Sequence, residues 1–190
     1  MKLVFASSNP GKIAEIRQML PPTIELLGLT DIGCFEDIPE TAETIEGNAI
    51  LKADYVTRNY GYDCFADDSG LEVHALGGEP GVKSARYSGE ARSSSDNIDL
   101  LLKKLEGQSN RSARFVTTIS LNLQGNRHVF TGYCKGTITQ RRIGDGGFGY
   151  DPVFMPDGYS QTFAQLSSEE KNRIGHRGIA FRILLAFLQK

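Results

Sequence analysis

The chain has 190 residues, of which 39% are hydrophobic and 23% are charged, and its formal net charge is −2. This length allows one domain with a real core, and the composition is typical of a soluble globular protein. The charge argues against a broad surface for nucleic acid or acidic membranes, although not against a local basic pocket. No stretch approaches the roughly 20 apolar residues that a membrane span needs.

Alternation, helical periodicity and turn residues predict the elements of the first half. They are, in chain order, a strand over 2–7, a helix over 12–20, a strand over 24–29, an acidic loop over 35–47, a helix from about Thr44 to Gly61, a buried strand over 63–68 and an extended piece over 71–76. Asp67 and Asp68 thus stand at the end of a strand, with a turn expected at Ser69 and Gly70.

The second half begins with an irregular glycine-rich loop, of the kind that often carries function. The predicted elements are that loop over 77–90, a helix over 93–107, a hairpin of strands over 113–123 and 128–139 with its turn at Gly125-Asn126, a loop and short strand within 144–159, and two helices within 167–190, the second from about His176. Hairpin and strand–helix units coexist, which predicts a single α/β domain over residues 1–190 with a central mixed sheet flanked by helices.

Three cysteines stand far apart and without CxxC spacing: Cys34, Cys64 and Cys134. The odd number and the spacing favour reduced, packed thiols over a disulfide framework or a zinc site. The apolar run at the N-terminus is too short for a signal peptide. The expected location is the cytoplasm.

The segment SSNPGK (7–12) joins a strand to a helix and ends in Lys12. Such a loop presents backbone N–H groups and a helix N-terminus to an anion, although its glycine spacing is not that of a Walker A loop. An ordinary capped turn with Pro10 at the first helical position is the alternative, and for this segment alone it is slightly favoured.

The segment DDSG (67–70) places two acids where α/β proteins usually bind ligands. Mg²⁺ takes oxygen ligands, commonly one or two carboxylates together with substrate phosphates. A turn built on an Asx-type aspartate and a tight glycine is an equal competitor.

Two later segments combine aromatic and cationic residues. In GGFGYDP (146–152), Phe148 or Tyr150 is a candidate for stacking on a planar base, and an aromatic pair plugging the sheet edge is the alternative. The segment EEKNRIGHRG (169–178) gathers cations that suit a base carbonyl or a phosphate, as an ordinary charged helix end also would. Taken together, an anion loop, an acid pair, an aromatic shelf and a cationic cluster suit a nucleoside triphosphate.

The chain resembles the inosine triphosphate pyrophosphatase family, which hydrolyses non-canonical purine nucleoside triphosphates. Six segments in the family's order carry the resemblance: SSNPGK (7–12), GNAILKA (47–53), ADDSGL (66–71), LGGEPGVKSARYSG (76–89), GGFGYDP (146–152) and EEKNRIGHRG (169–178). The resemblance implies an α/β fold whose two lobes enclose a nucleotide cleft, a homodimer, and Mg²⁺-dependent hydrolysis of ITP, dITP and XTP to the monophosphate and pyrophosphate.

The resemblance also implies roles for individual residues. Asp68 is expected to be the general base and a metal ligand, and Glu40 a second acid at the metal. Substrate contacts are expected from Ser7, Ser8, Asn9, Pro10, Gly11, Lys12, Lys52, Ser69, Phe148, Gly149, Tyr150, Asp151, Lys171, His176 and Arg177. Within this set Ser7–Lys12 would hold the phosphates, Lys12 and Lys52 would offset charge, Phe148–Asp151 would enclose the base, and Lys171, His176 and Arg177 would read it.

The chain departs from the family pattern at three places. Ser7-Ser8 stands where Thr-Gly is more frequent, Gly47 stands where Glu is frequent, and Gly175 stands where Ser usually precedes His-Arg. The last change removes a hydroxyl near the base, and we expect it to relax or shift preference at the purine 2-position.

Two other functions compete with this prediction. One is a regulatory module that binds a nucleotide without turnover, which would have less need of Glu40 and Asp68. The other is a related pyrophosphatase for pyrimidine or methylated nucleotides, which would lack GFGYDP and HRG together. Binding of nucleic acid is disfavoured by the charge balance.

Overall fold

Seven strands form one mixed sheet in the computed structural model, which describes residues 1–189. The strands are β1 Lys2–Phe5, β2 Glu25–Leu27, β3 Cys64–Val73, β4 Pro80–Gly81, β5 Ser112–Leu123, β6 Asn126–Ile138 and β7 Phe154–Pro156. Their order is β2-β1-β3-β5-β6-β7, with β4 paired to β3. The β1–β2 and β1–β3 pairs are parallel, whereas β3–β4 and β6–β7 are antiparallel. The prediction of an α/β fold with a mixed sheet is confirmed.

Five α-helices lie in the same described part of the chain. They are α1 Pro10–Met19, α2 Ile45–Tyr60, α3 Ser94–Lys104, α4 Ser168–Ile174 and α5 His176–Leu188. The predicted boundary at His176 is confirmed, as are the start of a helix at about Thr44 and its end at Gly61, where φ is +73°. No helix within residues 1–189 is long and apolar enough to cross a membrane. Cys34, Cys64 and Cys134 are buried free thiols, as expected.

The described residues fall into two compact units. The first unit contains 1–68, 117–132 and 177–189, and the second contains 69–116 and 133–176. The single domain expected over residues 1–190 stays a prediction, as does the cleft that the resemblance implies.

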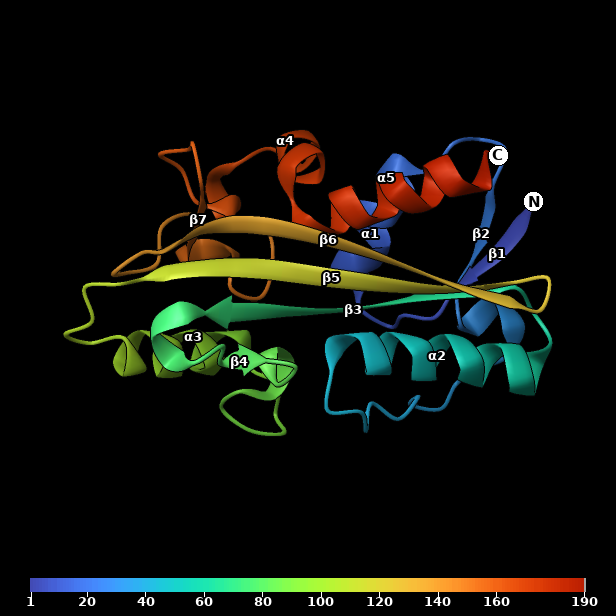
Figure 1. Ribbon diagram of the computed structural model, residues 1–190, viewed down its shortest axis with the longest axis horizontal. Coiled ribbons are helices and arrows are strands. Elements are labelled where there is room, and N and C mark those ends of the chain that lie inside the picture. The colour runs from blue at the N-terminus through green and yellow to red at the C-terminus, as the bar shows by residue number, and fades with distance from the viewer. Residues whose placement is uncertain (190) are drawn as a thin grey trace. The chain divides into compact units, whose positions relative to one another are not determined.

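In the first unit, helices cover both faces of the sheet (Figure 1). Because side chains alternate along a strand, Phe5 and Phe65 lie on one face and Val4, Cys64 and Ala66 on the other. The first face packs against α1 and α5, and the second packs against α2. This alternation decides which helix each later residue of β3 meets.

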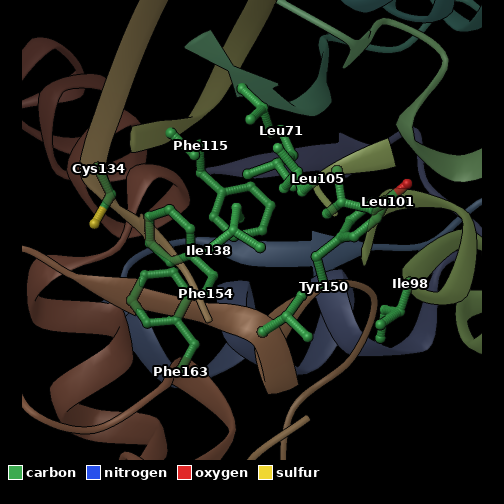
Figure 2. Packing of buried hydrophobic residues seen from close by; sticks show 13 residues of the cluster. Leu71, Ile98, Leu101, Leu105, Phe115, Cys134, Ile138, Tyr150, Phe154 and Phe163 are labelled. Carbon is green, nitrogen blue, oxygen red and sulfur yellow. The ribbon is translucent and has the colours of Figure 1, made fainter. Parts of the chain in front are cut away.

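The second unit has its own core, built from α3, β7 and the ends of β3, β5 and β6. Phe115, Phe154 and Phe163 gather there with Ile138, as Figure 2 shows. The rings of Phe115 and Phe154 meet edge to face with centroids 4.6 Å apart. Stacked and edge-to-face aromatic contacts of this kind add to the free energy of burial.

Two local predictions are wrong. The chain does not turn at Ser69-Gly70, because β3 continues through both residues and pairs with β4 at Leu71 and Glu72. The cross-strand partner keeps the backbone extended where the local sequence favours a turn. The β5–β6 hairpin turns at Gln124-Gly125, where φ is +49° and +80°, rather than at Gly125-Asn126. A two-residue turn with both φ values positive matches the twist of the strands it joins.

Candidate active site

Asp67 and Asp68 lie in the middle of β3 and point to opposite faces of the sheet. Asp67 shares its face with Phe65 and so meets α1 and α5, whereas Asp68 shares its face with Ala66 and meets α2. Neighbouring carboxylates are thereby separated into two different surroundings. The prediction that they stand at a strand's end before a turn is corrected accordingly.

The Asp67 carboxylate is buried in an ion cluster. Its two oxygens accept hydrogen bonds from Lys12 Nζ at 3.1 Å and from Arg177 Nε at 3.0 Å. Arg177 Nη1 also donates to Glu15, so α1 and α5 are joined through this cluster. The Asp67 side chain is 0% exposed and that of Arg177 is 4% exposed.

The groups of this cluster shift one another's pKa values. Burial lowers the pKa of Lys12 despite the nearby Asp67, and the positive charges of Lys52 and Arg177 act in the same direction as burial. Burial disfavours the ionised carboxyl, but Lys12 and Arg177 outweigh burial and hold the pKa of Asp67 below its usual range. Burial acts against the guanidinium too, and Asp67 and Glu15 raise the pKa of Arg177 despite it. Lys12 and Arg177 therefore favour the ionised form of Asp67.

Asp68 faces a different set of groups on α2. Its Oδ2 accepts a hydrogen bond from Asn48 Nδ2 at 3.2 Å, and its Oδ1 lies 4.0 Å from Lys52 Nζ. Lys52 Nζ donates to Glu40 Oε1 at 2.7 Å. The side chains of Asp68 and Glu40 are 12% and 23% exposed. Glu40, Lys52 and Asp68, all predicted from the sequence, are brought together.

The pKa directions distinguish Asp68 from its neighbour. Burial raises the pKa of Asp68, with the negative charges of Glu40 and Asp67 acting in the same direction. Burial disfavours the Lys52 ammonium, but Asp68, Asp67 and Glu40 outweigh it and raise the pKa of Lys52. The geometry thus provides a partly accessible carboxylate with increased proton affinity beside a protonated lysine.

The donor set at this point fits a magnesium ion. Asp68 and Glu40 offer carboxylate oxygens and already share one cation, the Lys52 ammonium. Within residues 1–189 there is no group of three or more His, Cys, Asp or Glu side chains that could hold a metal ion. Two carboxylates without a complete protein cage match a Mg²⁺ that takes further ligands from substrate phosphates.

The segment Ser7–Lys12 forms the capped turn that begins α1. The Asn9 side chain accepts a hydrogen bond from Lys12 N at 3.2 Å, and Ser7 Oγ accepts one from Asn9 N at 3.3 Å. Pro10 is the first helical residue. Ser8, Asn9 and Pro10 are exposed, so the helix N-terminus is accessible to an anion. The role of this segment in holding phosphates stays a prediction.

In the second unit, Asp151 organises the predicted base-binding segment. Its Oδ2 accepts hydrogen bonds from Phe148 N at 2.8 Å and from Lys171 Nζ at 2.5 Å. The Lys171 ammonium lies 4.4 Å from the centroid of the Phe148 ring. At Gly147, φ is +72° and an added Cβ would lie 2.0 Å from Asp151 Oδ2, so only glycine allows this close approach.

Two other predicted base contacts are buried among aromatic side chains. Tyr150 belongs to the core shown in Figure 2, and its hydroxyl donates to Ser84 O at 2.8 Å. Of the two aromatic candidates, Tyr150 is thus a core residue and Phe148 is half-buried, and stacking on a base stays a prediction for both. The His176 ring stacks on Phe115 with centroids 4.5 Å apart.

Ser69, Gly149 and Gly175 also belong to the predicted segments of this unit. Ser69 is half-buried in β3, and Gly149 has a φ of +59° with open space around an added Cβ. At Gly175 an added Cβ would lie 2.5 Å from Lys171 O, so a side chain there requires the end of α4 to shift.

The prediction from sequence missed several residues that hold the site. Asn48 is fully buried and bridges Asp68 to the backbone N–H of Ala42, 2.9 Å from its Oδ1. Its spacing of four residues from Lys52 on one helix was the available signal. Asp67 and Glu15 form the cluster with Arg177, from which they are separated by 110 and 162 residues in the chain. No local sequence pattern reveals contacts at such separations.

Comparison with known proteins matches the chain over nearly its whole length. The model of the Ham1 family matches residues 3–187. A protein of Flavobacterium johnsoniae named dITP/XTP pyrophosphatase is 63% identical over 99% of this chain and 98% of its own length. One of Flavobacterium psychrophilum with the same name is 61% identical over the full length of both. The structure of the Staphylococcus aureus Ham1 protein superposes with a TM-score of 0.91 at 42% identity, covering 100% of this chain and 98% of that one.

Proposed function

Because the chain belongs to the Ham1 family, we propose that it hydrolyses the non-canonical purine nucleoside triphosphates dITP, XTP and ITP to the monophosphate and pyrophosphate. The resemblance seen in the sequence is confirmed by the family match and by the identity with full-length dITP/XTP pyrophosphatases. One observation carries the chemical part of the proposal. Asp68, with a raised pKa, is partly accessible beside Glu40 and Lys52.

In the proposed mechanism, Asp68 orients a water molecule and accepts its proton. The water oxygen bonds to the α-phosphorus, the bond from that phosphorus to the bridging oxygen breaks, and pyrophosphate leaves with the bond's electron pair. Asp68 and Glu40 would hold Mg²⁺, which would neutralise part of the phosphate charge. Lys52 and Lys12 would place their amino groups beside the phosphates, and preorganised charge of this kind supplies most of the acceleration in phosphoryl transfer.

We assign the recognition of the base to Lys171 in α4, to His176 and Arg177 at the beginning of α5, and to Phe148. A hydrogen-bond donor of His176 or Arg177 would donate to the 6-oxo group of a purine and would oppose the 6-amino group of adenine. A site with polar groups left unpaired rejects the wrong substrate by about 10⁴-fold or more.

The proposal extends to the protein as a whole. We assign it a cytoplasmic location and a homodimeric state, without a nucleic-acid partner. The family resemblance supports the dimer, and the net charge of −2 supports the absence of a nucleic-acid surface.

The test is release of pyrophosphate against orthophosphate from dITP, ITP, XTP, GTP, ATP and dUTP, with and without Mg²⁺. We expect Mg²⁺-dependent pyrophosphate from the first three and little turnover of the others. Orthophosphate release would overturn attack at the α-phosphorus. Tight binding without turnover would favour a regulatory module, and preference for dUTP would favour a pyrimidine pyrophosphatase. In the same assay, Gly175→Ser should change the ratio of XTP to ITP turnover.

A further inference from the structure

The segment between the 3₁₀ turn at Thr30–Ile32 and α2 lies along that helix as an extended strap, residues 34–44. Its side chains alternate. Cys34 is buried, Ile38 packs against the core under α2, and Glu40 pairs with Lys52. Phe35, Asp37, Pro39, Thr41 and Glu43 are exposed, and so is Glu36, where the chain bends, so the alternation of inward and outward side chains holds from Asp37 to Glu43.

Glu36 attaches the N-terminal part of this strap to α2. Its Oε1 accepts hydrogen bonds from Tyr60 Oη at 2.6 Å and from Tyr55 Oη at 2.8 Å. Both tyrosines belong to α2. The hydrogen bond from Tyr60, followed by those from the backbone and Tyr55, holds the pKa of Glu36 at about 2, so the carboxylate is ionised at neutral pH. An ionised acceptor makes the stronger kind of hydrogen bond.

The attachments follow one another in antiparallel order along the helix. Glu36 meets the C-terminal end of α2, Glu40 meets Lys52 in the middle, and the Ala42 N–H donates to Asn48 near the beginning. Thr44 then caps the helix. The six steps from Glu36 to Ala42 cover about 20 Å in an extended chain, and the twelve steps from Tyr60 to Asn48 cover about 18 Å along α2, so strap and helix are matched in length between their attachments.

This alternation fixes which way Glu40 points. A slip of one residue in an extended segment turns every side chain to the other side. The Glu36 attachment lies four residues before Glu40 and the Ala42 attachment two residues after it. Together they hold the Glu40 carboxylate on the same side as Asp68.

We propose that Glu36, through Tyr55 and Tyr60, is a positioning residue that sets the affinity of the Glu40–Asp68 pair for a divalent cation. This inference rests on the proposed function for the metal's role in turnover. Under this proposal, three residues outside the site control the concentration of divalent cation that the enzyme needs for turnover. They are Glu36, Tyr55 and Tyr60.

The test compares Glu36→Ala and the double variant Tyr55→Phe/Tyr60→Phe with wild type, each as the full chain. Glu43→Ala is the matched control, because it removes the same charge from the same strap at an outward position. Three quantities are measured: the Mg²⁺ concentration for half-maximal pyrophosphate release, kcat at saturating Mg²⁺, and the Kd of Mn²⁺ from its EPR signal without nucleotide.

We expect Glu36→Ala and the double tyrosine variant to raise the half-maximal Mg²⁺ concentration and the Mn²⁺ Kd by about three- to tenfold, somewhat less than loss of a residue that contacts a metal ligand directly. The kcat at saturating Mg²⁺ should stay near that of wild type, as should every value for Glu43→Ala. The variant with all three substitutions should have the same Mg²⁺ and Mn²⁺ affinities as Glu36→Ala, because the three substitutions break one contact.

The outcomes separate the two proposals. A wild type that binds Mn²⁺ without releasing pyrophosphate contradicts the proposed function, and the Mn²⁺ Kd of the variants still decides the role of Glu36. Variants with Mg²⁺ and Mn²⁺ affinities equal to those of Glu43→Ala would overturn the inference, as would a wild type that binds no Mn²⁺. A kcat reduced equally at all Mg²⁺ concentrations would also overturn it. If Glu36→Ala does not fold, the same quantities are measured for Glu36→Gln and for each single tyrosine variant. Glu36→Gln keeps an oxygen that accepts hydrogen bonds.

Discussion

Asp67 and Asp68 are adjacent in the chain, and burial, Lys12 and Lys52 act on both carboxylates, yet the net pKa shift is downward for Asp67 and upward for Asp68. Lys12 and Arg177 stabilise the ionised form of Asp67, whereas burial destabilises the ionised form of Asp68. A group whose pKa is raised on folding costs stability at pH values above that pKa, and the cost disappears as the pH falls. The ionised Asp67 thus stabilises the folded state, whereas the ionised Asp68 lowers its stability.

For Asp68→Asn we therefore expect a melting temperature at pH 7 equal to or above that of wild type, together with a loss of kcat of about 10²- to 10⁴-fold. The amide removes the costly charge and, with it, the proton acceptor. Thermal unfolding and pyrophosphate release measured on the same preparation check both parts. Near-normal turnover would show that another group is the base.

Asp67→Asn should have the reverse effect on stability. The substitution leaves the buried Arg177 and Lys12 without their shared carboxylate, and breaking a buried ion pair from one side costs about 3–5 kcal/mol. Urea unfolding should show the loss as a lower midpoint. An unchanged midpoint would contradict the structural role of the Asp67 cluster, and Asp63→Asn, an acid one residue before β3, is the control.

At the scale of elements, β3 places the site because it is a single strand with two differently covered faces. Its first residues pair in parallel with β1 and its last with β4 in antiparallel. Helix α2 then meets one face with Asn48 and Lys52, and α1 and α5 meet the other with Lys12 and Arg177. The period of two in the strand, rather than any local motif, places the carboxylates of Asp67 and Asp68 on opposite faces of the sheet.

Helix α4 gives a pH-dependent test at this scale. Arg173 and Tyr159 both donate to Glu170 in its first turn, and they hold the pKa of Glu170 at about 2 against an ordinary value of 4.5. A lowered pKa means that the contribution to stability is complete above pH 4.5 and is lost as the pH falls toward 2. Glu170→Gln should therefore lower the melting temperature slightly at pH 7, with the difference from wild type vanishing near pH 2. A difference that is constant with pH would contradict this assignment.

At the scale of the whole molecule, ligand binding and assembly are the measurable properties. A ligand that binds only the folded state raises stability by about 2.7 kcal/mol at one hundred times its Kd. A non-hydrolysable dITP analogue should raise the melting temperature more with Mg²⁺ than without it, since the metal offsets the phosphate charge. Equal shifts with and without Mg²⁺ would contradict the metal's part in binding, and a non-hydrolysable ATP analogue is the control.

The homodimer implied by the resemblance is tested by sedimentation velocity over a range of concentrations. We expect a species of twice the mass of the 20.8 kDa chain. A single species at the monomer mass at all concentrations would contradict it.

The sequence by itself determined the element types, most of their boundaries and the family. Local signals carry that information, such as the Thr44 cap, the left-handed Gly61 and the apolar period of each strand. It also predicted Glu40, Lys52 and Asp68, which the structure brings together. Only the tertiary structure decided that β3 runs on through Gly70, that Arg177 is held by Asp67 and Glu15, and that Tyr150 is in the core. Strand pairing, burial and charge contacts between distant residues set these outcomes, and their energies depend on neighbours that no stretch of local sequence contains.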